Sequence, residues 1–156
     1  MMYLLVVGLT MLVLPLGSIA VEAGLGQTDW LWLIGKWFVF WGVGVRLLLA
    51  GLRQYFQPAF TSRDIMRIET PDAFVLVREL GGANVASGIV GIASLALPTF
   101  VLPSAVAAGL FYAVAAVEHA KSRHRESNEN IAMISDTFIA VVLLGFAARA
   151  LALGLR

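Results

Sequence analysis

Five apolar stretches dominate this chain of 156 residues, and each reaches the length of about 20 residues that an α-helix needs to cross the hydrocarbon core of a bilayer. Hydrophobic residues make up 60% of the chain and charged residues 13%, against about 45–50% and about 25% in soluble domains. The sequence therefore predicts an all-α polytopic membrane bundle, a single domain over 1–156, with spans at about 4–23, 31–55, 71–97, 100–120 and 131–155.

The first stretch has a second interpretation. Ser18, Ala20 and Ala23 follow a short apolar run, as in a signal peptide with a small-residue cleavage site. Because no basic residue precedes the run, we favour a retained helix, with cleavage as the alternative.

Basic residues gather in two of the four connections. They are Arg53, Arg63 and Arg67 around one link and Lys121, Arg123 and Arg125 around another. With five spans, both links lie on the side of the N-terminus. By the positive-inside rule that side is the cytoplasm, and the C-terminus is outside.

The link before the third span carries a helix signal of its own. Thr61 and Asp64 have the spacing of a capping box, and apolar residues follow them. We expect a short interfacial helix here, with an irregular loop as the alternative. Thr70 and Pro71 then read as the N-cap and first residue of the third span.

Polar side chains occur at one depth on four predicted spans. Counted at about 1.5 Å per residue from the cytoplasmic helix ends, Arg46 lies about 14 Å deep and Glu79 about 12 Å deep. Their matched depth predicts a direct ion pair, which is either part of a binding site or a purely structural pair that sets helix register. The proposed ligand-binding residues of this cytoplasmic half are Arg46, Glu79, Tyr112, His119 and Asp136.

Two further polar residues have simpler interpretations. Asn84 lies on a face with Gly81, Gly88 and Gly91, and is expected to hydrogen-bond between helices. Arg53 is close enough to a helix end for its side chain to reach the interface. Both are therefore predicted to be structural.

Other classes of site have little support. The chain has no cysteine, so disulfides and thiolate metal sites are excluded. His119 and His124 form no spaced ligand motif, and no metal site is predicted; no cofactor can be named. The net charge of +1 gives no sign of a nucleic-acid surface.

Four segments carry a family resemblance. They are GKWFVFWGVGVRLLLAGLRQYFQPAFT from Gly35, RELGGANVASGIVGIASL from Arg78, GLFYAVAAVEH from Gly109 and NENIAMISD from Asn128. They resemble an uncharacterised family of small prokaryotic membrane proteins, which implies the prokaryotic cytoplasmic membrane. The second segment is also similar to the DoxX-like four-helix membrane proteins, some of which accompany quinone-linked oxidoreductases, although this chain has an additional first helix. Asn128 and Glu129 lie within the recognised segments and are assigned structural roles.

The function predicted from these features is binding of a lipid, quinone or other amphiphile in the cytoplasmic half of the bundle. A membrane oxidoreductase component and a small transporter or proton pathway are the alternatives, so enzymatic activity is left open. The bilayer is the expected environment, and a homo-oligomer is compatible with the sequence.

Overall fold

The computed structural model describes residues 2–121 and 127–154, and these residues form helices and connecting turns without any strand. Five helices are long and apolar enough to cross a membrane, as predicted. They extend over Met2–Gly24, Trp30–Phe56, Ala73–Ala93, Pro98–Lys121 and Ser127–Ala152. Arg123 and Arg125, which contributed to the predicted orientation, lie outside the described residues.

The first two spans each contain a π-helical segment. The first consists of α1 (Met2–Gly8), η1 (Leu9–Val13) and α2 (Leu14–Gly24), and the second of α3 (Trp30–Phe38), η2 (Val39–Val45) and α4 (Arg46–Phe56). A π-helical turn accommodates more residues than an α-helical turn and is frequent at functional sites. The residues after η2, beginning with Arg46, are therefore rotated relative to a continuous α-helix.

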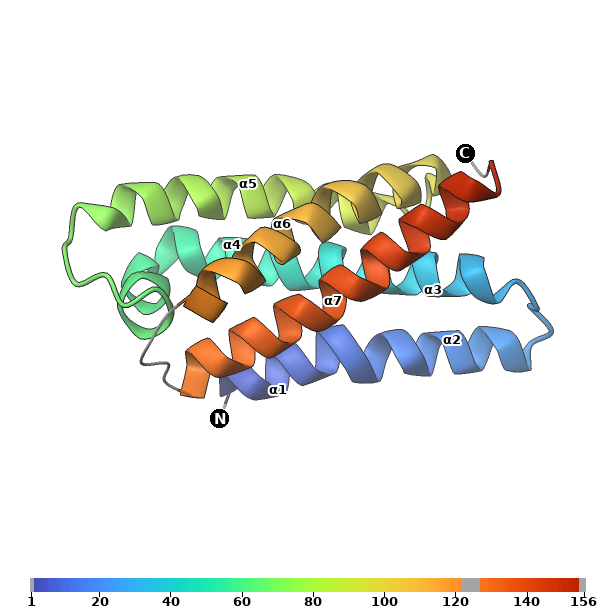
Figure 1. The fold of residues 1–156 in the computed structure, drawn as a ribbon, viewed down its shortest axis with the longest axis horizontal. Coiled ribbons are helices and arrows are strands. Elements are labelled where there is room, and N and C mark those ends of the chain that lie inside the picture. Colours follow the sequence, from blue (N-terminus) through green and yellow to red (C-terminus); the bar gives the residue numbers. More distant parts are fainter. Residues whose placement is uncertain (1, 122–126, 155–156) are drawn as a thin grey trace.

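The remaining spans are α5 (Ala73–Ala93), α6 (Val101–Lys121), preceded by the 3₁₀ turn η4 (Pro98–Phe100), and α7 (Ser127–Ala152). In Figure 1, α5 runs beside α4 and α6 beside α7, and the two ends of the chain lie at opposite ends of the bundle. The third span begins later than predicted. Thr70 and Pro71 form a turn, in which the Ala73 N–H donates to the Thr70 carbonyl at 3.2 Å.

Glycines bring α5 into backbone contact with the second span. A Cβ at Gly88 would lie 2.6 Å from the backbone nitrogen of Leu48, and a Cβ at Gly91 would lie 2.6 Å from the backbone nitrogen of Gly44. Small residues allow such close approach between membrane helices. The face of the second span that carries Gly44 and Leu48 is therefore occupied by α5.

A different face of the second span packs on α7. A Cβ at Gly42 would lie 2.7 Å from Cδ1 of Ile139, and Gly35 likewise packs against the ring of Phe146. Arg46 follows Gly42 by four residues and lies on the same side of the helix. The side chain of Arg46 consequently points away from α5.

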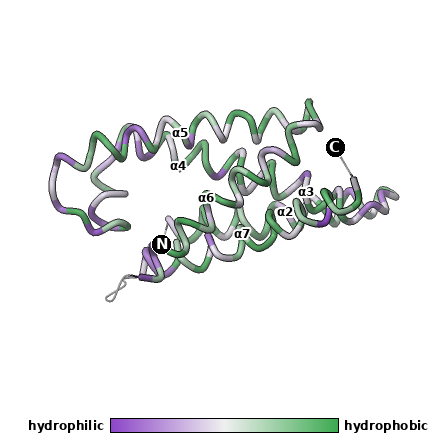
Figure 2. Tube along the Cα trace, turned by 45° about the horizontal axis from the view of Figure 1, so that its top comes forward, coloured by the Kyte–Doolittle hydropathy of each residue, from purple (hydrophilic) through white to green (hydrophobic). Residues whose placement is uncertain are grey.

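The apolar core extends from the middle of the bundle toward the end that carries the C-terminus. Leu33 and Val39 from the second span, Val101 from α6, and Ile139 and Leu143 from α7 are fully buried. Figure 2 shows hydrophilic residues gathered at the connections and helix ends. The polar residues of the cavity are thus placed beyond this core, toward the α4–α5 connection.

The α4–α5 connection contains the predicted short helix, as the π-helical segment η3 (Phe60–Ile65). The capping-box assignment was wrong, because the N-cap position is Ala59 and Thr61 lies inside the segment. Thr61 and Ser62 are buried, and the Ser62 hydroxyl donates to the Ile68 carbonyl at 2.5 Å. The connection therefore packs back against the bundle.

Candidate ligand-binding site

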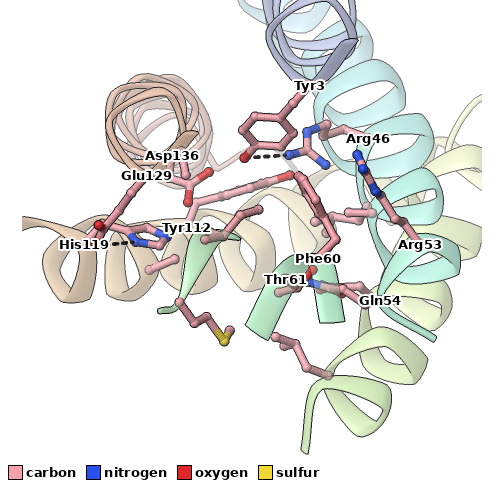
Figure 3. Close-up of a pocket in the computed structure, with 18 of the residues that line it drawn as sticks. Tyr3, Arg46, Arg53, Gln54, Phe60, Thr61, Tyr112, His119, Glu129 and Asp136 are labelled. Carbon is pink, nitrogen blue, oxygen red and sulfur yellow. Dashed lines mark hydrogen bonds and ion pairs between the residues drawn. The ribbon is translucent and has the colours of Figure 1, made fainter. Parts of the chain in front are cut away.

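A cavity of about 880 Å³ lies at the end of the bundle that carries the N-terminus and the α4–α5 connection. Its walls come from α1, α4, η3, α6 and α7, and from Leu80 and Asn84 of α5. The volume falls within the range of about 300–1,000 Å³ that is common for small-molecule sites. Figure 3 shows its polar side chains, among them Tyr3, Arg46, Arg53, Tyr112, His119 and Asp136.

Arg46 lies on one wall and is only 9% exposed. Its Nη2 donates a long hydrogen bond of 3.5 Å to the Tyr3 hydroxyl, and its Nε is buried without a hydrogen-bond partner. Among the residues that the structure describes, no carboxylate forms an ion pair with Arg46. A buried guanidinium with so little compensation has hydrogen-bonding capacity left for another molecule.

Tyr112 lies between the two walls (Figure 3). It is 3% exposed, and its hydroxyl donates to the carbonyl oxygen of Gly42 at 2.7 Å. The hydroxyl proton is thus used within the protein. Tyr112 lines the cavity and links α6 to the π-helical segment that precedes Arg46.

The opposite wall carries the acidic residues of α7. Asp136 is 9% exposed and Glu129 is 4% exposed. Glu129 Oε1 lies 3.8 Å from Nδ1 of His119, while Glu129 Oε2 is buried without a hydrogen-bond partner. Because α7 begins at Ser127, four residues before the predicted start, Asp136 lies about two and a half turns inside the helix.

Glu79 does not belong to this site, so the predicted ion pair with Arg46 was wrong. Glu79 is exposed on α5 and does not line the cavity. The positions of both residues around their helix axes explain the error. Asn84 and Gly88 face α4, which directs Glu79 away from it, since Glu79 lies about 140° around the helix from Asn84. Arg46 in turn lies on the face of the second span directed away from α5.

The other polar residues fall into two groups. The Asn84 side-chain amide donates to Gln54 Oε1 at 2.8 Å and so connects α5 to α4. Asn128 is half-buried in the first turn of α7. Arg53 lines the cavity, as Asn84 also does, and its guanidinium carbon is 3.4 Å from the centroid of the Phe60 ring.

Some cavity residues were not predicted from the sequence. Tyr3 comes from the first turn of the first helix, and Phe60 and Thr61 come from the connection. Glu129, assigned only a structural role, also lines the cavity. An aromatic residue at a helix end, as Tyr3 is, was the available signal, but such residues are also common as interface anchors.

The donor set offers oxygen and imidazole groups on one side and guanidinium groups on the other. In the described part of the chain, no group of three or more His, Cys, Asp or Glu side chains is arranged to hold a metal ion. The arrangement is suited to a polar molecule that hydrogen-bonds to both walls.

Comparison with known proteins gives a family and no further relatives. No curated protein and no solved structure matches the chain. The sequence matches a family described as a family of unknown function (DUF6790), over residues 1–154. Since this match covers nearly the whole chain, including the first helix, the protein belongs to the DUF6790 family.

Proposed function

We propose that this integral membrane protein binds an amphiphile, holding its polar head in the cavity between α4, α6 and α7. The observation that carries the proposal is Arg46, a buried guanidinium that faces the cavity with an unbonded Nε and no carboxylate partner among the described residues. An ionised group in a bilayer interior needs a compensating partner. An oxygen of a bound head group would supply it.

The apolar part of the cavity fits the rest of such a molecule. Leu49 of α4 and Val114 of α6 line the cavity and are 46% and 63% exposed. Phe111 and Leu80 add further apolar surface to its walls. A hydrocarbon tail that leaves the polar site along these side chains would remain in an apolar environment.

We place this site in the cytoplasmic half of a prokaryotic inner membrane, with the N-terminus inside and the C-terminus outside. Arg53, Arg63, Arg67 and Lys121 all lie at the end of the bundle that contains the cavity. Their position favours that end as cytoplasmic by the positive-inside rule.

Lipids and quinones are the two amphiphile classes that we consider. Arg46 can donate to a lipid phosphate or to a quinone carbonyl. The similarity of the Arg78–Leu95 segment to DoxX-like proteins supports a quinone, whereas the charges on both walls support a lipid head group.

The test is mass spectrometry of small molecules that remain with the full chain after purification in mild detergent. We expect one amphiphile in near-stoichiometric amount with the unaltered protein and with Arg78→Gln, whose arginine is exposed on α5 outside the cavity. Arg46→Gln should lose it. Equal retention by both variants, or a protein that carries no amphiphile, would contradict the proposal.

A further inference from the structure

The two arginines and the two buried carboxylates of the cavity lie on opposite walls. Arg46 and Arg53 stand seven residues apart on α4, which places them on one side of the helix. Figure 3 shows both on the wall opposite Asp136, Glu129 and His119. In the described part of the chain, no ion pair joins the two walls.

The basic wall is arranged to receive an anion. The guanidinium of Arg53 stacks on Phe60, and stacking of this kind leaves the N–H groups at the edge of the guanidinium available for acceptors. Arg46 has a buried Nε without a partner. Two guanidinium groups with unused donors match the oxygen atoms of a phosphate.

The acidic wall is arranged to receive hydrogen-bond donors. Asp136 and Glu129 are also seven residues apart on one helix, and both are more than nine-tenths buried. Glu129 Oε2 has no hydrogen-bond partner. Glu129 Oε1 is 3.8 Å from His119 Nδ1, so only the second oxygen of this carboxylate lacks a donor. A buried carboxylate oxygen without a donor is costly, so this wall favours a ligand with a positively charged N–H donor.

We propose that the head group recognised here is zwitterionic, a phosphate ester next to a primary ammonium, as in an ethanolamine phospholipid. This inference rests on the proposed amphiphile-binding function and specifies its ligand. The phosphate lies against Arg46 and Arg53, and the ammonium donates to Asp136 and Glu129. The exposed apolar side chains of Leu49 and Val114 at the cavity carry the acyl chains.

Two other common phospholipid heads fit the walls less well. A glycerol head group supplies no positive charge to the carboxylates of Asp136 and Glu129. A choline head group has the charge, but its trimethylated nitrogen has no N–H to donate to an unpartnered carboxylate oxygen. The ethanolamine head satisfies both requirements.

The experiment is native mass spectrometry of the full chain in mild detergent, titrated with ethanolamine, glycerol and choline phospholipids of identical acyl chains. The unaltered protein should bind the ethanolamine lipid about tenfold more tightly than either of the others, the ratio expected from one hydrogen bond to a charged group. Soluble phosphoethanolamine should not displace the lipid at comparable concentration.

Substitutions test which residues produce the preference for the ethanolamine lipid. Asp136→Asn keeps the shape of the side chain but removes its charge, and should reduce the preference for ethanolamine to near equality. Glu79→Gln removes a carboxylate that is exposed outside the cavity and should leave the preference unchanged. Arg46→Gln should weaken the binding of all three lipids, whereas Arg78→Gln should not.

Each outcome separates the two proposals. Equal binding of the three lipids by the unaltered protein, or displacement by phosphoethanolamine at equal concentration, overturns the zwitterionic-lipid assignment while leaving amphiphile binding intact. Binding of no lipid, together with no co-purified amphiphile, overturns both. If Asp136→Asn does not fold, the preference of the unaltered protein still decides the assignment.

Discussion

Tyr112 of α6 donates a 2.7 Å hydrogen bond to the carbonyl oxygen of Gly42, which lies in the π-helical segment directly before Arg46. The bond joins α6 to the part of the second span that directly precedes Arg46. Both residues are buried. Tyr112 therefore both lines the cavity and holds this part of the second span in position.

Tyr112→Phe should lower the free energy of unfolding by about 1–3 kcal/mol, because it removes the donor from a buried carbonyl oxygen. Reversible unfolding in mixed detergent micelles measures this change. Tyr55→Phe is the matched control, since Tyr55 is exposed at the end of α4, and its effect should stay within about 0.5 kcal/mol. Equal effects of the two substitutions would show that the Tyr112–Gly42 bond does not stabilise the fold.

Gly88→Ala should lower the free energy of unfolding by about 1–3 kcal/mol, because the new Cβ would displace the backbone of the second span at Leu48. Gly82→Ala is on the same helix but meets nothing within 4 Å. It should be neutral or stabilising by up to about 1 kcal/mol, since alanine favours helix over glycine. Thermal unfolding of both variants in the same detergent tests this. If Gly82→Ala were destabilising and Gly88→Ala were not, α5 would pack on the second span through the face that carries Gly82.

Asn84 and Gln54 should show a measurable coupling energy in a double-mutant cycle with alanine. Their side chains are joined by a 2.8 Å hydrogen bond between α5 and α4. Interhelical bonds of this kind in membrane proteins contribute about 0.6 kcal/mol on average and at most about 1.7 kcal/mol. A coupling energy of zero in reversible unfolding would mean that this bond contributes nothing to the pairing of the helices.

Arg46→Leu and Glu79→Leu should have additive effects on the free energy of unfolding, to within about 0.5 kcal/mol. Glu79 is exposed outside the cavity and does not pair with Arg46. Unfolding of the two single variants and the double variant tests this. Recovery of stability in the double variant would instead indicate a direct interaction between the two side chains.

Reporter fusions placed after residue 125 and at the C-terminus should give opposite sidedness, with the first in the cytoplasm. The two ends of the last span lie at opposite ends of the bundle. We expect the end with the basic residues, which is the cavity end, to be inside. The same side for both fusions would contradict five spans, and reversed sides would contradict the orientation.

The sequence by itself determined the number of spans and the concentration of polar residues in one half of the bundle. Length and apolarity define a span because backbone groups in lipid must be satisfied within the helix. Arg46, Tyr112, His119 and Asp136 could be assigned to the same half of the bundle because the rise per residue is constant.

Tertiary structure decided which of these side chains meet. Depth says nothing about rotation around the helix axis, so it does not show that Arg46 faces the cavity and Glu79 does not. Through close packing at glycines, α5 occupies the face of the second span that carries Gly44 and Leu48, and Glu79 points away from Arg46. Tyr3 of the first span instead lies within hydrogen-bonding distance of Arg46. Such contacts depend on how whole helices pack against one another, which the spacing of residues along one helix does not specify.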